Sequence, residues 1–282
     1  MSSKKQEKKS NFLYYLIMFI IILGFILVIW SRYISTKGLR VREYSISSDK
    51  LLLNDAGVKI VQFSDLNYNS TVFEEELVNL VDTINELRPD LVFFTGDLFS
   101  KKVNVSEKDK EIITREFKRI ESNIDKYAVK GDNDYATMYF DSVMNEAEFK
   151  VLNNTDEYIY SGSSKPIYLY GLDDMIKGNP NYDGINIDND FYKIVLVHEP
   201  DSFDNFKDKN VDLVLAGHSR NGQVRLPFIG PLYRERGYKK YYDEHYIFDN
   251  TNVYISGGIG TNNYKFRFLT KPSINFFRLY NK

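Results

Sequence analysis

Five short blocks of acidic, amide and histidine residues follow apolar runs along the chain. They are Ser64-Asp65-Leu66-Asn67, Thr95-Gly96-Asp97-Leu98, Gly131-Asp132-Asn133-Asp134, Val197-His198-Glu199-Pro200-Asp201 and Gly217-His218-Ser219-Arg220. Carboxylate oxygens and imidazole nitrogens bind divalent metals such as Mn, Fe and Zn. Two such ions, roughly 3.5–4 Å apart and bridged by one carboxylate, support the hydrolysis of phosphate esters. The residue types therefore predict a metal-dependent site assembled from separate loops.

The fifth block is the most informative, because it keeps one expected ligand and lacks another. Residues 217–223 read Gly-His-Ser-Arg-Asn-Gly-Gln. This stretch resembles the Gly-His-Thr-His-Gly-Gly-Gln signature of calcineurin-like metallophosphoesterases, in which both histidines bind metal. His218 keeps the first position, but Arg220 stands at the second, and an arginine that holds its proton cannot be a ligand. The resemblance implies a two-metal hydrolase with at least one altered metal site.

The resemblance extends to all five blocks in order, and the chain also resembles the family's closing segment at Ser256-Gly257-Gly258-Ile259-Gly260 and Arg267. It is most similar to the membrane-anchored bacterial branch, which includes phosphoesterases similar to UDP-2,3-diacylglucosamine pyrophosphohydrolase. The implied fold is α/β: a four-layer sandwich of two mixed β-sheets flanked by helices.

The resemblance assigns the candidate ligands to two metal sites. The altered site would use Asp65, Asp97, Asn67 as a poor amide ligand in place of a histidine, and the position now held by Arg220. The second site would use four residues that can all bind metal: Asp97, Asp132, His198 and His218. We therefore expect one divalent ion, Mn, Fe or Zn, rather than two.

Asn133 and Arg220 are the candidate catalytic residues. Asn133 replaces the family histidine that assists the leaving group, and an amide can donate a hydrogen bond but cannot supply a proton. We expect the Arg220 guanidinium to pair with Asp65 within reach of Asp97, in the place of the missing metal. Two roles stay open for it: bidentate binding of a phosphate oxygen, or a salt bridge that only holds the altered site together.

The elements that must position these residues alternate between strand and helix in the first half of the chain and are strand-rich in the second. Apolar β-branched runs predict strands at 58–63, 91–94, 127–129, 167–170, 194–197, 213–215, 246–248, 253–256 and 274–279. Helical spacing predicts helices at 73–87 and 112–124. Residues 137–165 and 230–245 are expected to be loops that determine substrate choice, and His245 is expected at the surface. Each metal candidate follows a strand, where α/β sheets place their sites.

The N-terminal region predicts a membrane anchor. Residues 1–11 form a basic tail, 12–31 the anchor, 32–56 a linker with a first strand pair, and 57–282 the phosphoesterase domain. The uncharged run 12–30 would be about 28 Å long as a helix, close to the ~30 Å hydrocarbon core of a bilayer. A cleaved signal peptide is the alternative, but its apolar region would be shorter. The lysines of the tail favour an N terminus inside and a domain outside the cell membrane.

Composition excludes several classes of function. The chain has 282 residues, a formal net charge of −2 and no cysteine. The lack of cysteine excludes disulfides, thiolate catalysis and cysteine zinc sites, and nothing in the charge balance indicates a nucleic-acid partner. The expected partners are the bilayer and a phosphorylated small molecule or lipid head group.

Two functions stay open. One is a membrane-anchored hydrolase acting on a phosphoester or pyrophosphate bond. The other is a catalytically impaired relative that binds a metal, a phosphorylated ligand or a protein partner.

Overall fold

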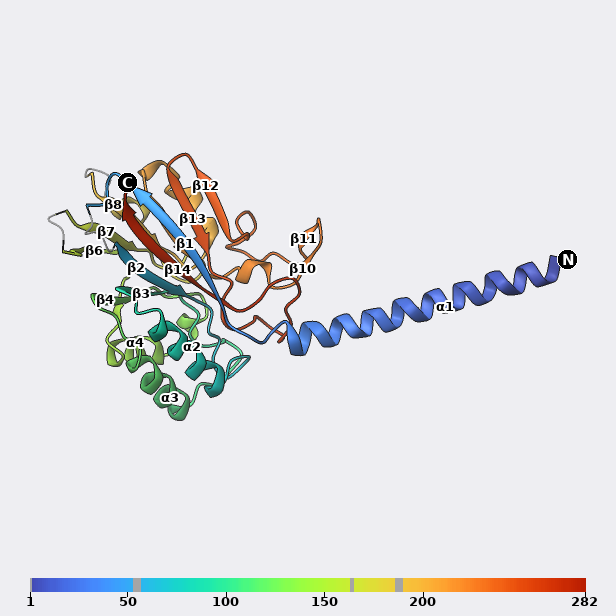
Figure 1. Cartoon of the computed structure of the whole chain (residues 1–282). Coiled ribbons are helices and arrows are strands. Elements are labelled where there is room, and N and C mark those ends of the chain that lie inside the picture. Colours follow the sequence, from blue (N-terminus) through green and yellow to red (C-terminus); the bar gives the residue numbers. More distant parts are fainter. Residues whose placement is uncertain (1, 53–56, 163–164, 186–189) are drawn as a thin grey trace.

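Two six-stranded mixed β-sheets form the body of the molecule (Figure 1). The computed structural model describes residues 2–52, 57–162, 165–185 and 190–282. The first sheet has the order β1 (Arg40–Ser48), β14 (Ser273–Asn281), β2 (Val58–Phe63), β3 (Leu91–Phe94), β4 (Asp125–Ala128) and β5 (Lys150–Val151). The second has the order β12 (His245–Phe248), β13 (Thr251–Ile255), β9 (Leu213–Ala216), β8 (Tyr192–Leu196), β7 (Ile167–Gly171) and β6 (Thr155–Ile159).

Parallel pairing dominates the centre of each sheet, which fixes where the loops meet. Strands β2, β3, β4 and β5 run parallel, as do β7, β8, β9 and β13. The carboxyl ends of the central strands therefore lie at one edge, where α/β sheets bind ligands. Each of the nine strands predicted between residues 58 and 279 is present within a few residues, and the predicted α/β fold of two mixed sheets with helices is confirmed.

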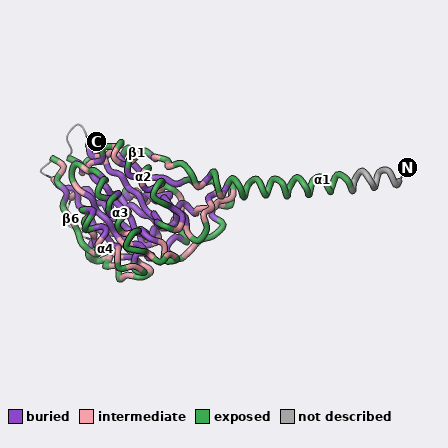
Figure 2. Tube along the Cα trace, turned by 90° about the horizontal axis from the view of Figure 1, so that it is seen from below, coloured by how far each residue is buried: buried purple, intermediate pink, exposed green. Residues whose placement is uncertain are grey.

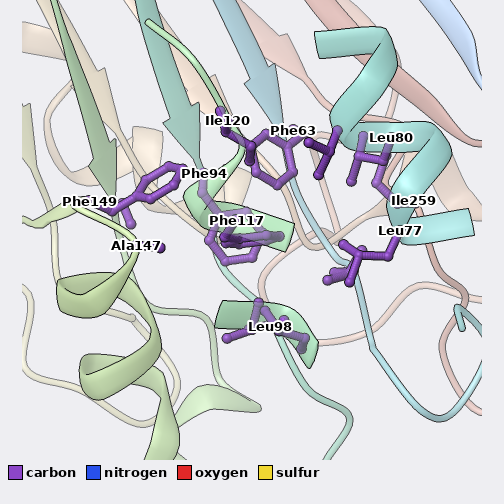
Figure 3. Close-up of a cluster of buried hydrophobic side chains, with 14 of the residues drawn as sticks. Phe63, Leu77, Leu80, Phe94, Leu98, Phe117, Ile120, Ala147, Phe149 and Ile259 are labelled. Atoms are coloured by element: carbon purple, nitrogen blue, oxygen red, sulfur yellow. The ribbon is translucent and has the colours of Figure 1, made fainter. Parts of the chain in front are cut away.

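Three helices cover the outer face of the first sheet: α2 (Glu74–Glu86), α3 (Glu107–Lys118) and α4 (Tyr139–Glu146) (Figure 1). One apolar cluster contains Leu77 and Leu80 of α2, Phe117 of α3, and Phe63 and Phe94 of the sheet (Figure 3). The centroid of the Phe117 ring lies 5.7 Å from that of Phe63 and 6.0 Å from that of Phe94. All five side chains are buried. Because truncating one such core phenylalanine to alanine costs about 3–5 kcal/mol, this layer holds the strands that carry the first three blocks.

A second apolar layer fills the space between the sheets. Ile60 and Phe93 of the first sheet lie in one cluster with Leu169, Ile194 and Leu215 of the second. The outer face of the second sheet is covered by a third cluster that includes side chains from 3₁₀ turns, among them η4 (Pro200–Asn205). The remaining short helical turns are η2 (Asp134–Ala136), η3 (Tyr182–Gly184), η5 (Lys207–Lys209) and η6 (Arg220–Gly222).

Three expectations about local structure are wrong. The second helix spans 107–118 rather than 112–124, because Ser106 and Asp109 form a capping box that starts it earlier. Residues 137–165 are not one loop, since they contain α4, β5 and β6. His245 is half-buried rather than a surface residue, because its ring stacks on Tyr254 with centroids 4.0 Å apart.

The predicted strand pair within 32–56 is also wrong for the described residues of that segment. Strand β1 is its one strand there, and it pairs in parallel with β14 at the far end of the chain. Residues 53–56 lie outside the described residues. Strands β1 and β14 thus join the N- and C-terminal parts of the domain in one sheet.

A long apolar helix precedes this body. Helix α1 (Ser2–Ile29) continues into a π-helical turn, η1 (Trp30–Ile34). The segment Asn11–Ile34 contains an 18-residue stretch with a mean hydropathy of 3.0, is long enough to cross a membrane, and is exposed along most of its length (Figure 2). Only its end is held by the body: the Arg267 backbone N–H donates to Ser31 O at 3.0 Å, and Ser35 Oγ donates to Thr270 O at 3.1 Å.

Candidate metal centre

The five sequence blocks converge at the carboxyl ends of β2, β3, β4, β8 and β9. Their backbones are unusual: Asp65, Asp97, His218 and Arg220 all have a left-handed φ, between 50° and 64°. For non-glycine residues this conformation costs on the order of 1 kcal/mol each and persists where the surrounding structure imposes it. Clustering of such residues is typical of functional sites.

Four of the predicted ligands form a tight cluster. One ligand atom from each of Asp97, Asp132, His198 and His218 lies within 4.8 Å of the others. His198 Nε2 lies 3.2 Å from His218 Nδ1 and 3.5 Å from Asp97 Oδ1. His218 Nδ1 lies 3.6 Å from Asp132 Oδ1. The structure thus brings together all four residues predicted for the second metal site.

Backbone carbonyls set the direction in which both imidazoles point. His198 Nδ1 lies 2.6 Å from Thr95 O, and His218 Nε2 lies 2.9 Å from Arg236 O. A carbonyl only accepts hydrogen bonds, so each of these nitrogens carries an N–H, and the other two ring nitrogens, His198 Nε2 and His218 Nδ1, face one another. Such outward N–H donation is usual for metal-binding histidines.

The spacing of these atoms fits a single cation. Two ring nitrogens facing each other at 3.2 Å repel through their lone pairs unless a positive charge lies between them. Two ligands at metal–nitrogen distances of 2.0–2.1 Å in a tetrahedral site are about 3.3 Å apart. The donor set of two imidazoles and two carboxylates suits Mn, Fe or Zn. The residues therefore fit one divalent ion.

The charges of the clustered side chains also favour a cation between the two histidines. Burial lowers the pKa of His198, but the neighbouring Asp97 raises it more, so the net pKa lies well above its usual range. Burial and then the charge on His198 lower the pKa of His218. The two rings thus share one positive charge between them. A divalent ion bound there meets the same need.

Asp132 is less deeply buried than the other ligands. Burial and then the Asp97 charge raise the pKa of the Asp132 carboxyl, while both histidines oppose this. Lys101 Nζ lies 3.7 Å from Asp132 Oδ2 on the solvent side. Asp132 is therefore the ligand on the solvent side of the cluster.

Arg220 lies where the sequence predicts it. The side chain is buried, and Nη2 lies 2.8 Å from Asp65 Oδ1 and 2.9 Å from Asp97 Oδ2. Nη1 donates to His218 O at 2.8 Å. Burial lowers the pKa of Arg220, but the two carboxylates outweigh it, so the guanidinium stays charged. The predicted contacts with Asp65 and Asp97 are confirmed.

Asn133 contacts Asp97 on both carboxylate oxygens. Its backbone N–H donates to Asp97 Oδ1 at 3.1 Å, and its side-chain Nδ2 donates to Asp97 Oδ2 at 2.6 Å. Asp97 Oδ2 therefore accepts from both Asn133 and Arg220. The net pKa of Asp97 lies well below its usual range, because His198 and Arg220 outweigh the effect of burial.

The two remaining predicted ligands lie outside the four-ligand cluster. Asp65 is fully buried, and besides Arg220 it accepts the backbone N–H of His218 at 3.0 Å. Asn67 is buried with a left-handed φ of 48°, and its Nδ2 has no hydrogen-bond partner within the described part of the chain. Arg220, rather than Asn67, thus neutralises Asp65.

Asp134 organises the site in a way that sequence reasoning missed. Its carboxylate accepts backbone N–H groups from Asp97 at 2.8 Å, Leu98 at 2.8 Å and Gly131 at 2.9 Å. This ties the loop after β3 to the loop after β4. In the sequence, this role could be indicated only by the position of Asp134 as the last acidic residue of the third block.

Gly131 and the buried Arg267 complete the surroundings. A Cβ on Gly131 would lie 2.6 Å from Asp97 Oδ1 and 2.7 Å from His198 Nε2, so only glycine lets this loop approach. Arg267, fully buried, donates to the carbonyls of Gly257, Gly258 and Gly260 at 2.6–2.9 Å. These contacts hold the 257–260 loop against Asp65 and Arg220.

Comparison with known proteins gives a consistent result. Residues 58–220 match the calcineurin-like phosphoesterase family. The chain is 31% identical over 255 residues to the uncharacterized metallophosphoesterase YkuE of Bacillus subtilis, covering 89% of this chain and 88% of that protein. It is 26% identical over 281 residues to the uncharacterized metallophosphoesterase YkoQ of the same organism, covering 93% and 100%.

A more distant relative has a named activity. The chain is 25% identical over 249 residues to the UDP-2,3-diacylglucosamine pyrophosphatase LpxG of Chlamydia muridarum, covering 71% of this chain and 74% of that protein. Family match, fold and metal-ligand cluster agree with one another. The chain belongs to the calcineurin-like phosphoesterase family of metal-dependent hydrolases that act on phosphoester bonds.

Proposed function

We propose that the protein is a membrane-anchored, metal-dependent phosphoesterase that works with one divalent ion and one buried arginine. Asp97, Asp132, His198 and His218 hold the ion. Arg220 takes the place of the second ion beside Asp65. The bond cleaved is a phosphoester or a pyrophosphate.

The observation that carries this proposal is that Asp97 Oδ2 accepts hydrogen bonds from two side chains. In a two-metal site one carboxylate bridges the ions. Here Arg220 Nη2 at 2.9 Å and Asn133 Nδ2 at 2.6 Å both donate to that oxygen. Asp97 therefore has one oxygen, Oδ1, directed toward the histidine pair. This arrangement supports one ion and disfavours two.

The formal charge of the site indicates how strongly it can attract a phosphoryl group. When bound, a divalent ion supplies Lewis-acid polarisation of a phosphoryl oxygen and lowers the pKa of water. Three carboxylates, one arginine and one divalent ion sum to a formal charge of about zero, so the pull on an anionic phosphoryl group is weak. Arg220 presents its charge next to the cluster and orients Asp97, while the two histidines keep their ring N–H groups on backbone carbonyls.

The lipid surface is the proposed location of the substrate. The LpxG relative acts on a diacylated sugar nucleotide, as its name states, and α1 is long and apolar enough to anchor this chain to a bilayer. Ser31 and Ser35, at the end of that segment, are buried in contacts with residues 267–270. These contacts favour a retained anchor over a cleaved signal peptide. We place the N terminus inside the cell and the domain outside.

A second candidate function has its own supporting observation. The Asn133 side chain is engaged with Asp97 and has no acidic proton to give to a leaving group. A relative that binds a metal or a phosphorylated ligand without turnover would show the same contact.

The third histidine of the chain provides a matched control for the test. Full-length protein in detergent is stripped of metal, supplied with Mn²⁺ and assayed with bis(p-nitrophenyl) phosphate. His198→Asn should lose both bound metal and turnover. His245→Asn should keep both, because His245 contacts Asn252 and Tyr254 and lies outside the cluster.

Each outcome decides between the candidates. Metal-dependent turnover that depends on His198 supports the phosphoesterase. Metal binding that depends on His198 without turnover supports the binding protein. If His198→Asn binds metal as wild type does, the assigned site is wrong.

A further inference from the structure

A group of large apolar side chains is exposed around the small hairpin β10 (Arg225–Leu226) and β11 (Gly230–Pro231). We call it the apolar rim, and it consists of Phe228, Ile229, Leu232, Tyr233 and Tyr264. Phe228 is fully exposed at the hairpin tip, and the other four are 59–74% exposed. Exposed apolar groups gathered in one place mark surfaces that contact a membrane or another protein.

The backbone of the hairpin holds these side chains outward. Residues 226–229 form a turn closed by the Ile229 N–H on Leu226 O at 3.3 Å. Phe228 has a left-handed φ of 64°, a strained conformation for an aromatic residue. The strain supports an external role for the ring, since no gain in core packing compensates for it.

The hairpin and the end of the anchor are attached to the same segment, residues 267–270. Arg225 N–H donates to Phe268 O at 3.0 Å. On the other side, Arg267 N–H donates to Ser31 O at 3.0 Å. Figure 1 shows the hairpin projecting from the body on the same side as α1, near the end at which the helix joins the body. A bilayer that holds α1 therefore lies close to the hairpin tip.

A cavity leads from the rim toward the metal centre. It has a volume of about 340 Å³, and its lining includes Arg220 and Ser219 together with Leu232, Tyr233 and Tyr264. The cavity is thus lined both by residues of the loop that carries Arg220 and by residues of the apolar rim.

We propose that the apolar rim docks into the surface of the same bilayer that holds α1, so that this cavity faces the lipid head groups. Phenylalanine, tyrosine and aliphatic side chains are those that enter the interface between head groups and acyl chains. Arg234 and Arg236 follow the hairpin as exposed cations, complementary to anionic lipid phosphates. The proposal rests on the membrane anchoring in the proposed function.

The absence of cysteine from the chain permits a direct test on the full-length protein. Phe228→Cys and, separately, Tyr264→Cys are labelled with an environment-sensitive fluorophore and reconstituted into vesicles of phosphatidylethanolamine and phosphatidylglycerol. Quenching by brominated lipid is compared with quenching by aqueous iodide. Tyr160→Cys is the control, because Tyr160 is also an exposed aromatic residue and follows β6, at the end of the body opposite α1 in Figures 1 and 2.

Labels at 228 and 264 should show blue-shifted emission and strong quenching by brominated lipid, while the label at 160 responds to iodide alone. If labels at 228 and 264 respond to iodide as 160 does, the rim lies in water and the proposal is wrong. Protection from both quenchers would mean that a protein, such as a second copy, covers the rim, which also overturns it.

One further label separates this proposal from the anchoring on which it rests. Ile20→Cys, in the middle of α1, should be quenched by brominated lipid whether or not the rim docks. Quenching at 20 without quenching at 228 and 264 would refute docking alone. Loss of quenching at 20 would refute the anchor itself.

Discussion

Replacing Arg220 by methionine tests the role of the buried guanidinium. Methionine keeps most of the side-chain length and removes the charge. Arg220 is 2% exposed and contacts Asp65 and Asp97 at 2.8 and 2.9 Å. The variant leaves those two carboxylates buried without their cation, which is the costly way to break an ion pair.

The structure gives the expected size of the effect. Removing one partner of a buried pair destabilises a protein by about 3–5 kcal/mol. For a domain of this size that is roughly 6–20 °C in Tm. Arg225→Met is the matched control: Arg225 pairs with Asp243 at 2.6 Å, but the two side chains are 24% and 47% exposed. Such surface pairs contribute about 0–1 kcal/mol.

Thermal unfolding of metal-free, full-length protein in detergent measures both variants. Without Arg220, two buried carboxylates lose the cation that contacts both of them. The Arg220→Met protein should therefore unfold well below wild type at pH 8, and the Arg225→Met control should unfold close to wild type. If the Arg220→Met protein has the same Tm as the Arg225→Met control at pH 8, Arg220 does not neutralise the buried carboxylates and the proposed role is refuted.

Four further outcomes are expected. Gly131→Ala should abolish metal binding measured by titration calorimetry, because its Cβ would lie 2.6 Å from Asp97 Oδ1, whereas Gly24→Ala has open space and should bind as wild type; equal binding would contradict the close approach. Asp132→Asn should weaken Mn²⁺ binding by roughly 10-fold or more, since an anionic ligand becomes neutral; unchanged affinity would remove Asp132 from the ligand set. The triple variant Asn67→His, Asn133→His, Arg220→His should bind more metal than wild type and hydrolyse bis(p-nitrophenyl) phosphate faster; no change in either would mean that the lost histidines do not limit the protein. Burial raises the pKa of Glu116, but Arg115 and Arg119 lower it more, so the Tm difference between wild type and Glu116→Gln should be full above the unfolded-state pKa of ~4.3 and be lost as pH falls through the lower folded-state pKa; a difference that does not shrink as the pH is lowered into this range would exclude this ion pair as its source.

The resemblance to the family signature located the candidate site in the sequence, and each of its blocks combines a predicted strand end with a residue type that can bind metal. Largely apolar runs of four to six residues before Asp65, Asp97 and His218 indicated buried strands, and parallel strands bring their carboxyl ends together. The pairing of Arg220 with Asp65 followed from charge, since a buried carboxylate whose metal is missing needs another cation.

Features that depend on distant parts of the chain were not predictable. Strand β1 pairs with β14, more than 230 positions away, and no local pattern indicates that pairing. Helix α3 begins at a capping box whose signal competes with apolar periodicity. The exposure of Phe228 and Ile229, and the position of their hairpin on the same side of the body as α1, both depend on how the whole chain folds.

The number of metal ions per chain tests the central claim most directly. Purified full-length protein is saturated with Mn²⁺, freed of excess metal and analysed by elemental mass spectrometry against its protein concentration. One ion per chain is expected, lost in His198→Asn and kept in His245→Asn. Two ions per wild-type chain, or none, would contradict a single-ion site completed by Arg220.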